Sequence, residues 1–380
     1  MPLSAAQMAQ VEAAYYAAAV RRSQKLPAQT VSAGGSYDIA MPNAGVATDI
    51  QLTFDGTFSR TETATVGTVT ATTKGAFAVI SNVGFKDYLG IDRAVGIDGY
   101  DLFVHEITTE NIDPTYGTAA LMADPDSIGY AFTVPTGTAS STTTSTCIFT
   151  VTLPISVLRS SVRGSYPFTV PRSQNVLHFE IQPTLTSSNA TTAAFPVTIT
   201  GASSVSFSGS VYIEYFYYDV PASVALPTWL FSEVHELVKV KDQSNLSAGS
   251  DKQFQLPTGR TYLRIYERLV NGTSLTYGAN GSLTITEMKF LIDSATPTID
   301  MLTRDYIRRY LKEHKASPQP GDFVYDFSSH PWSPDSYGSL STSLIINSAA
   351  TINSGATLEV LRQCLYTQAQ NPNLVQAGVS

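Results

Sequence analysis

Residues 205–221 read VSFSGSVYIEYFYYDVP, the strongest β-strand pattern in the chain. Successive side chains of a strand point to opposite faces of its sheet. One face of this strand would carry Val211, Ile213, Tyr215 and Tyr217, and the other Tyr212, Glu214, Phe216 and Tyr218. Because both sets are mostly apolar or aromatic, we predict that both faces are covered, inside a multilayer structure or beside another domain.

The pattern changes directly after this strand. Residues from Ala28 to Asp219 read almost wholly as strands and turns, and strands resume from Lys252. Between them, Pro221 to Val240 shows the apolar spacing of a helix, with a stripe of Leu230, Val234, Leu237 and Val238. A chain of 380 residues is long enough for two or more cores. The layout therefore predicts two β-sandwich domains that meet at this helical segment.

The composition narrows the class of protein. Only 14% of the residues are charged and the net charge is −8, so Ser, Thr, Asn and Gln must cover much of the surface, which suits protein contact. An acidic chain lacks the clustered basic face of a dedicated nucleic-acid-binding protein, and we predict no specific nucleic-acid partner. The N-terminus has no signal-peptide pattern and no apolar run is long enough to cross a membrane, so we expect neither secretion by that route nor a membrane span.

The two cysteines are expected to pack in the core and not to form a disulfide or bind a metal ion. Cys147 and Cys364 both lie in apolar, strand-like segments, where a free thiol behaves as a small hydrophobe. Two isolated cysteines form neither a disulfide framework nor a zinc site. We predict that both are in the core and that the protein holds no cofactor.

Two further segments are predicted to be helical. Ser4 to about Ser23 begins with a capping-box pattern, carries Met8, Val11, Tyr15 and Ala18 as an apolar stripe, and gathers Arg21, Arg22 and Lys25 at its end. This arm would pack either on its own domain or on a neighbouring subunit. Thr298 to about Lys315 has one apolar side and a basic side that carries Arg304, Arg308, Arg309, Lys312 and Lys315. That basic face is either solvated or in contact with an acidic neighbouring subunit or an anionic surface.

Three segments between the strands are harder to interpret. Residues 81–101 break the alternation, which suggests a short helix around Phe85 to Ile91 within a long connection. Thr61 to Thr73 and Ser140 to Thr146 are rich in Ser and Thr, so they form edge strands or loops.

A search for catalytic or metal-binding residues finds no convincing set. His235-Glu236-Leu-Val-Lys239 has a lysine where a zincin helix needs its second histidine. His105-Glu106 is expected to be a solvated pair at the end of a strand. Two predicted loops are rich in aspartate: one carries Asp92, Asp98 and Asp101, and the other carries Asp124 and Asp126. Turn formation, which aspartate favours, is the preferred interpretation, and Ca²⁺ binding is the less favoured one. We therefore predict no enzymatic activity.

The order of these segments resembles the double jelly-roll major capsid proteins of tectivirus-like, tailless, membrane-containing dsDNA bacteriophages. The resemblance rests on segments taken in sequence, although Thr61 to Thr73 has no assigned counterpart: SAAQMAQVEAAYYAAAVRRSQ, VGFKDYLGIDRAVGIDGYDLFVHE, LPISVLRSSVRGSYPFTVPRSQNVLHFEI, VYIEYFYYDV, LPTWLFSEVHEL and MLTRDYIRRYLKEHKASPQPGDFVYDF. It implies an all-β fold of two consecutive eight-stranded jelly-roll sandwiches with a few short helices. The corresponding division is an N-terminal helical arm at 1–27, a first jelly roll at 28–226, a connector at 227–250, a second jelly roll at 251–367 and a tail at 368–380.

The same resemblance implies a structural role in a virion. Homotrimers would form pseudo-hexagonal capsomers of an icosahedral capsid over an internal membrane, assembled in the host cytoplasm. Partners would be the chain itself, minor capsid or vertex proteins, and the membrane near the N-terminal arm. The residues expected at assembly interfaces are Met8, Val11 and Tyr15 on the arm, Trp229 and Phe231 at the domain junction, and Arg308 and Arg309 on the basic helix.

Two other functions fit the sequence. A β-sandwich adhesion or carbohydrate-binding protein would also use Tyr and Trp on long loops. A hydrolase built on a jelly roll would need an acidic pair or a metal cluster within one cleft. Ligand affinity of a monomer would favour the first, and an obligate trimer without a ligand would favour the capsid protein.

Overall fold

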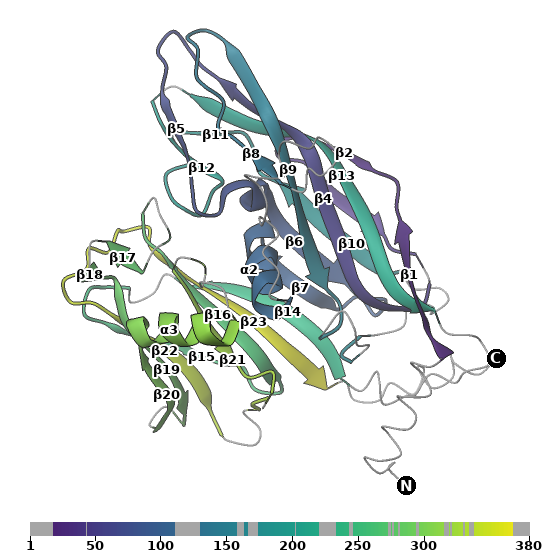
Figure 1. Cartoon of the computed structure of the whole chain (residues 1–380), viewed down its shortest axis with the longest axis vertical. Coiled ribbons are helices and arrows are strands. Elements are labelled where there is room, and N and C mark those ends of the chain that lie inside the picture. The colour runs from purple at the N-terminus through teal and green to yellow at the C-terminus, as the bar shows by residue number, and fades with distance from the viewer. Residues whose placement is uncertain are drawn as a thin grey trace.

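The computed structural model describes residues 18–42, 44–110, 130–157, 163–165, 174–201, 203–219, 233–242, 246–272, 275, 277–279, 282–293, 296–314, 319, 321–329, 331–333 and 338–367. Strands dominate this part of the chain (Figure 1). Its helices are α2 (Gly99–Glu110), α3 (Thr303–His314) and the 3-10 helix η1 (Gly75–Val79). The prediction of an all-β protein with a few short helices is confirmed.

The first jelly roll consists of two facing sheets. One has the order β1-β13-β4-β9-β8, with β2 and β11 also on β13: β1 (Val20–Lys25), β2 (Gln29–Val31), β4 (Val46–Thr61), β8 (Ala131–Phe132), β9 (Thr142–Pro154), β11 (Leu185–Thr186) and β13 (Ser204–Asp219). The other has the order β3-β10-β6-β7: β3 (Ser36–Ala40), β6 (Ile80–Lys86), β7 (Asp92–Ile97) and β10 (Val176–Ile181).

The second jelly roll repeats this plan. One sheet has the order β14-β23-β16-β21: β14 (Glu233–Asp242), β16 (Thr261–Val270), β21 (Asp322–Asp326) and β23 (Thr357–Thr367). The other has the order β15-β22-β19-β20: β15 (Asp251–Gln255), β19 (Ile285–Ile292), β20 (Thr296–Leu302) and β22 (Leu340–Ile346). Two small sheets pair β5 (Thr68–Ala71) with β12 (Val197–Thr200), and β17 (Gly278–Ala279) with β18 (Ser282–Leu283).

The strand order identifies both halves as eight-stranded jelly rolls. Jelly-roll strands are lettered B to I along the chain, and they form the sheets B-I-D-G and C-H-E-F. In the first half, B is β1 with β2, F is β7 and I is β13; in the second half, B is β14, F is β20 and I is β23. The helices α2 and α3 both lie between the F and G strands of their own jelly roll. The predicted double jelly roll is therefore confirmed.

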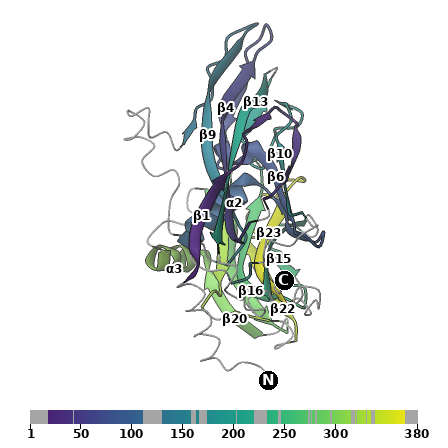
Figure 2. The same cartoon turned by 90° about the vertical axis from the view of Figure 1, so that its right-hand side faces the viewer.

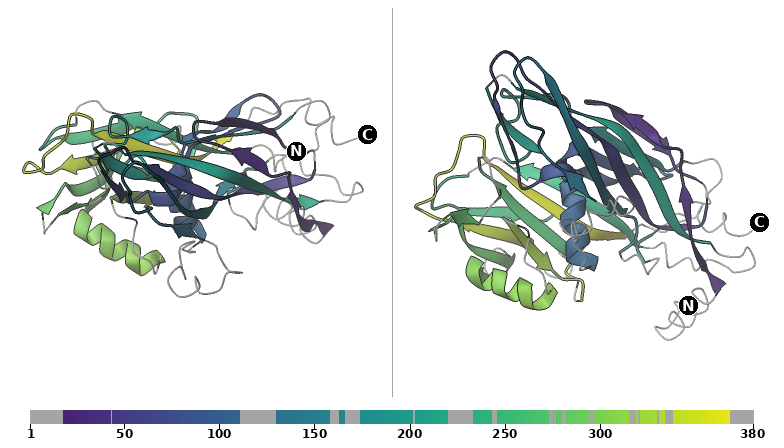
Figure 3. Two further views of the ribbon diagram at one scale, coloured as in Figure 1. Left: turned by 90° about the horizontal axis from the view of Figure 1, so that it is seen from above. Right: turned by 45° about the horizontal axis from the view of Figure 1, so that its top comes forward.

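One sheet continues from the first jelly roll into the second. The F strand β7 pairs in parallel with the B strand β14, through Ala94 with Leu237 and Val95 with Val238. This pairing joins two four-stranded sheets into the eight-stranded order β21-β16-β23-β14-β7-β6-β10-β3. The two jelly rolls therefore lie side by side, with α2 at the junction between them (Figure 1 and Figure 3).

Each jelly roll has an apolar core lined by aromatic rings. In the first, Phe77 stacks on Phe103 of α2 with ring centroids 4.0 Å apart, and Phe54 stacks on Phe149. In the second, Phe290 packs on Phe327 with centroids 4.6 Å apart. Cys147 and Cys364 are buried free thiols, so the prediction that both are in the core is confirmed.

The predicted N-terminal helix is wrong at its C-terminal end. Val20–Lys25 forms β1, which pairs antiparallel with β13 over six residues. The cations that suggested a helix end are instead spaced along an exposed edge strand, where Arg22 binds Asp219 at 2.8 Å. Met8, Val11 and Tyr15 lie outside the described residues.

Two other helix predictions also need correction. Glu233–Asp242, expected to be helical, is the strand β14. The basic helix begins at Thr303 and not at Thr298, because Thr296–Leu302 is the strand β20, paired with β19. In both cases tertiary strand pairing outweighs a local apolar spacing that also fits a helix.

The segment around residues 81–110 is also rearranged relative to the prediction. Residues 80–97 form the hairpin of β6 and β7, and the helix lies later, at α2. His105 and Glu106, expected to be a solvated pair at a strand end, are buried on α2 with 4% and 8% exposure. Leu102 and Val104, whose apolar character suggested a strand, are instead buried on α2, which is a core helix.

The two faces of the strand β13 differ in burial. Val211, Ile213 and Tyr215 are buried, whereas Tyr212 on the opposite face is 49% exposed. The second face is partly covered within the single chain, since Glu214, Phe216 and Tyr218 are half-buried; its full coverage, expected in a multilayer structure or beside another domain, stays a prediction. Most of the Ser/Thr-rich segment Ser140 to Thr146 belongs to β9. Residues 142–146 pair with β4 but with no other described strand, because β8 reaches only Cys147 and Ile148, so the predicted edge strand is confirmed for this part. These long strands extend the first jelly roll well beyond the second (Figure 2).

Candidate assembly site at the junction of the jelly rolls

Buried charged side chains from both jelly rolls meet beside the β7–β14 pair. The first jelly roll contributes Lys74, Asp98 and Asp101, which precede η1 or begin α2. The second contributes one residue from each strand of its B-I-D-G sheet: Lys239, Glu359, Arg268 and Asp322. All seven are at most 8% exposed. We call this set the junction cluster.

Ion pairs connect the junction cluster across the two jelly rolls. Lys239 Nζ lies 2.8 Å from Asp101 Oδ2, 3.0 Å from Asp98 Oδ2 and 3.1 Å from Glu359 Oε2. Lys74 Nζ binds Asp98 at 2.8 Å and Glu359 at 3.1 Å. Arg268 binds Asp322 at 2.6 Å and both Asp101 and Glu359 at about 3 Å. Each cation therefore binds two or more carboxylates, and four of these eight ion pairs join one jelly roll to the other.

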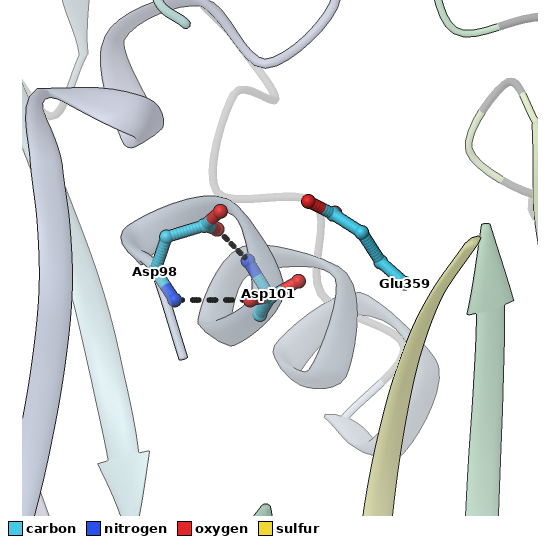
Figure 4. A group of neighbouring side chains, drawn as sticks. All are labelled: Asp98, Asp101 and Glu359. Carbon is cyan, nitrogen blue, oxygen red and sulfur yellow. Dashed lines mark hydrogen bonds between the residues drawn. The ribbon is translucent and has the colours of Figure 1, made fainter. Parts of the chain in front are cut away.

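Local structure at the start of α2 places the two aspartates. The backbone amide of Asp98 donates to Asp101 Oδ2, and the amide of Asp101 donates to Asp98 Oδ1, both at 2.9 Å (Figure 4). This reciprocal arrangement is a capping box, which satisfies two amides of the first turn that have no partner within the helix. The second carboxylate oxygens remain available, and the carboxylate of Glu359 faces them (Figure 4).

The pKa values show how the cluster is held ionised. Burial alone would raise the pKa of Glu359, but the charges of Lys74, Lys239 and Arg268 outweigh it and hold that pKa well below its ordinary value. The same balance lowers the pKa of Asp98 and raises that of Lys239. Asp322 differs, because burial outweighs its bond with Arg268 and raises its pKa to about 6. Three cations thus face four carboxylates, and Asp322 takes a proton more readily than Asp98 or Glu359.

This arrangement suits cohesion better than metal binding. Oxygen atoms of Asp98, Asp101 and Glu359 lie within 4.8 Å of one another, a spacing that a metal ion could bridge. The ammonium groups of Lys74 and Lys239 and the guanidinium of Arg268 already neutralise these oxygens at hydrogen-bond distances. Of the other acidic residues suggested for an ion, Asp92 is exposed and lies 3.8 Å from Lys86, and Asp124 and Asp126 lie outside the described residues.

A second ion-pair group lies further along the same junction. Arg93 on β7 binds Asp87 at 2.8 Å and Glu236 on β14 at 2.9 Å. Glu236 also binds Arg260 at 2.7 Å, and the Arg260 guanidinium lies 4.5 Å from the ring centre of Tyr366. Glu236 therefore links the two jelly rolls, and the His235-Glu236 motif is part of a buried strand and not of a metal-binding helix.

His235 itself has a structural environment. Its Nε2 lies 3.0 Å from Nε2 of Gln363 on β23. Burial, reinforced by the nearby charge of Arg264, lowers the pKa of His235 to about 4. A neutral imidazole accepts the amide hydrogen of Gln363, so this histidine stabilises the β14–β23 pair.

The predicted interface residues do not belong to the junction cluster. Arg308 and Arg309 lie on the exposed side of α3, with side chains 82% and 58% exposed, and they make ion pairs within the helix to Asp305 and Glu313. Trp229 and Phe231 lie outside the described residues. α3 packs through the buried rings of Tyr306 and Tyr310, which leaves the arginines free for contact with another molecule.

Sequence reasoning noted Asp98 and Asp101 but missed most of the junction cluster. Arg268 stands within the apolar strand TYLRIYERLV, and Glu359 within TLEVLRQCLYT. A charged residue inside a continuous apolar strand is rarely buried unless it is paired. That signal could have identified both residues, although not their partners.

The fold defines a class of protein, the double jelly-roll proteins. No protein-family model and no curated protein sequence matches the chain, so the similarity is visible in structure alone. The structure resembles the STIV MCP with a TM-score of 0.63 and 14% identity, over 93% of this chain and 99% of that one. A structure of the Sulfolobus turreted icosahedral virus gives the same TM-score over 94% of this chain and 96% of that one.

A phage protein shows the same architecture. The major capsid protein of bacteriophage PM2 superposes with a TM-score of 0.51 and 10% identity, over 93% of this chain and 99% of that protein. At such identities the likeness establishes the fold. It also shows that nearly the whole length of each chain is shared, and not one sandwich alone.

Proposed function

We propose that this protein is the major capsid protein of a dsDNA virus, and that its homotrimers form the pseudo-hexagonal capsomers of an icosahedral shell. The observation that carries the proposal is the fixed junction between two like jelly rolls. A shared sheet and a buried ion-pair cluster hold them in one orientation. Three copies of such a pair supply six similar jelly rolls, as a near-sixfold building block requires.

The architecture of the solved relatives supports the same role. The structures that it resembles include the major capsid protein of bacteriophage PM2 and the PBCV-1 virus capsid. In the described part of the chain, the chemistry at the junction is structural, since buried cations neutralise the one cluster of carboxylates. A protein with this role stabilises a shell through repeated contacts and catalyses no reaction.

The remaining partners belong to the same proposal. The shell would enclose an internal membrane and be assembled in the host cytoplasm, with the segment before β1 near the membrane and with minor or vertex proteins at special positions. Among the described residues, no helix has the length and apolarity needed to span a bilayer. As a working division, the first jelly roll runs from β1 to β13 and the second from β14 to β23.

The native mass of the purified full-length chain tests the proposal. We expect a homotrimer, and negative-stain images with hexagonal particles. A stable monomer at micromolar concentration would overturn the trimeric capsomer. A monomer that also binds a sugar on a glycan array would favour the adhesion or carbohydrate-binding alternative.

A further inference from the structure

Two strands have unpaired edges and are equivalent, in the repeated jelly-roll plan, to the two strands that pair at the junction. Within the chain, the F strand of the first jelly roll (β7) pairs with the B strand of the second (β14). The remaining B strand, β1, and the remaining F strand, β20, are edge strands, and no other described strand pairs with their outer sides. Figure 1 shows β1 and β20 at opposite ends of the molecule.

We infer that β20 of one copy pairs in parallel with β1 of the next copy, in the way that β7 pairs with β14 inside each chain. The inference rests on the proposed homotrimer and specifies its contact surface. The contact is head-to-tail, and such contacts close into rings when the rotation between copies permits it. In a ring of three copies, one kind of F-to-B contact would then recur at every boundary between jelly rolls.

The helices that follow the two F strands both carry an aspartate as their third residue. Asp101 is the third residue of α2, and it binds Lys239 on the neighbouring B strand at 2.8 Å. Asp305 is the third residue of α3, and its side chain is 57% exposed, with only the long 3.8 Å contact to Arg308 among the ion pairs of the described chain. Asp305 therefore has the position of Asp101 but lacks a B-strand cation, for which the nearest candidate on β1 of another copy is Lys25.

Charge on the two edges is complementary. All six residues of β1 are exposed, and they include Arg21, Arg22 and Lys25. β20 carries the exposed Asp300, which lies beside Glu287 on β19. Exposed apolar side chains occur on both edges as well, with Val20 at 55% and Leu302 at 56%. Lys289 lies 3.9 Å from Asp300, so the acidic character of the β20 edge rests on Asp300 and the nearby Asp305 and is weaker than the basic character of β1. The basic β1 edge still favours pairing with this edge over pairing with a second β1.

The junction also predicts a register. Ala94 lies five residues before the first residue of α2, and Thr298 lies five before the first residue of α3. Leu237 lies four residues after the start of β14, and Gln24 four after the start of β1. Because Ala94 pairs with Leu237, we expect Thr298 of one copy opposite Gln24 of the next.

Disulfide cross-linking tests this register in the full-length protein. The native cysteines are buried, so engineered surface thiols report without interference. The double variant Gln24→Cys with Thr298→Cys should form disulfide-linked dimers and trimers, and nothing larger, on a denaturing non-reducing gel. Each single variant should run as a monomer on the same gel. The matched control joins Gln24→Cys to Thr144→Cys, on an exposed residue of β9 away from both edges, and should not cross-link.

A backbone substitution tests the same contact without relying on the register. The Leu26 amide donates to the Ile213 carbonyl at 2.9 Å, and amides that point toward β13 recur at every second residue. The amide of Ser23 therefore points outward, so Ser23→Pro leaves the β1–β13 ladder intact and removes a donor to the next copy. We expect about tenfold weaker trimer association per lost hydrogen bond.

Charge reversal adds a rescue experiment. Asp305→Lys and Lys25→Glu should each weaken the trimer, because the register places Lys25 nearest to the counterpart of Lys239, and the double variant should recover part of the loss if the two edges meet. Circular dichroism and thermal melting control for folding, since Asp305 also lies 3.8 Å from Arg308 within the chain. A trimeric wild-type protein that neither cross-links nor responds to these substitutions would overturn the edge contact alone. A monomeric wild-type protein would overturn the proposed function itself.

Discussion

Lys239 Nζ lies 2.8 Å from Asp101 Oδ2, and this pair joins the B strand of the second jelly roll to the first turn of α2 in the first. Both side chains are 1% exposed. Removing two charges from water costs several kcal/mol per ion, so such a pair adds little net stability by itself. Its contribution is orientation: the pair forms only when β14 and the first turn of α2 are aligned as they are here, which favours this arrangement of the two jelly rolls.

The first prediction concerns loss of that cation. Lys239→Met should lower the free energy of unfolding by about 3–5 kcal/mol, because it leaves Asp98, Asp101 and Glu359 short of a buried partner. Chemical denaturation followed by circular dichroism measures the change. Lys241→Met is the matched control on the same strand, since Lys241 is 59% exposed and 3.8 Å from Glu359, and it should cost less than about 1 kcal/mol. Equal effects of the two substitutions would contradict a special role for the junction.

The second prediction concerns pH. Burial raises the pKa of Glu267 from 4.5 to about 7, although Thr342 and Tyr325 donate hydrogen bonds to its carboxylate. Between these two pH values the folded state binds more protons than the unfolded state, so the unfolding free energy falls as pH rises through that window. Glu267→Gln imitates the protonated group and should remove a pH-dependent loss on the order of 3 kcal/mol.

The comparison of wild type and Glu267→Gln at pH 5 and pH 8 checks this prediction. The variant should gain stability relative to wild type at pH 8. Asp322, with its pKa raised to about 6, acts in the same direction and remains in both proteins. Glu359 has a lowered pKa, so its contribution is lost only at more acidic pH and does not confuse the comparison. A constant difference at both pH values would show that Glu267 does not titrate in this range.

The class of fold was predictable from sequence, whereas the junction was not. Alternating patterns such as 205–221 revealed the strands, because each has one face in a core. β14 was taken for a helix because its faces do not alternate: Glu236 and Lys239 are buried beside Val234 and Leu237. Those charges are tolerated only because their partners lie far away in the chain, with Asp101 separated from Lys239 by 138 residues. A local pattern cannot reveal such a pairing.

The exposed surfaces that we propose for assembly were partly predictable. The amphipathic pattern of the basic helix correctly placed Arg308 and Arg309 on an exposed face. The strand β1 was missed because all its residues are exposed, which leaves no alternation to read. The strand β20 was missed because its partly buried Ile299 also fits the apolar side of the helix predicted from Thr298. Only the strand order, with its repeated F-to-B relation, identifies them.

The third prediction separates assembly from folding on α3. In the double variant Arg308→Glu with Arg309→Glu, the unfolding free energy should change by about 0.5 kcal/mol or less, because both side chains are exposed. Repulsion between the new glutamates and Asp305 or Glu313 is a separate local effect. The same substitution should reduce shell or sheet formation, since it reverses the charge of the helix face. Thermal melting and electron microscopy of assembled particles measure the two effects. Normal shells from a stable variant would remove the arginines from the interface.

The fourth prediction concerns the segment before β1. Deletion of residues 1–17 keeps β1 and its pairing with β13, whereas deletion through Ser23 removes most of that strand. We expect the shorter deletion, which removes Met8, Val11 and Tyr15, to leave soluble trimers that no longer tile into shells. Native mass and negative-stain images test this. Normal shells from the shortened chain would show that the segment has no role in tiling.

The fifth prediction concerns the close approach of η1 and α2 beside the junction. A Cβ atom at Gly99 would overlap the backbone carbonyl oxygen of Phe77, which cannot move without shifting η1. Gly99→Ala should therefore destabilise the protein by about 1–3 kcal/mol, as overpacking of a core does. Gly355→Ala is the control, because no atom lies within 4 Å of its added Cβ. If Gly99→Ala also weakens the trimer and Gly355→Ala does not, the position of α2 is coupled to the contact between copies. If both variants have the melting temperature of the wild type, η1 and α2 approach each other less closely than the structure indicates.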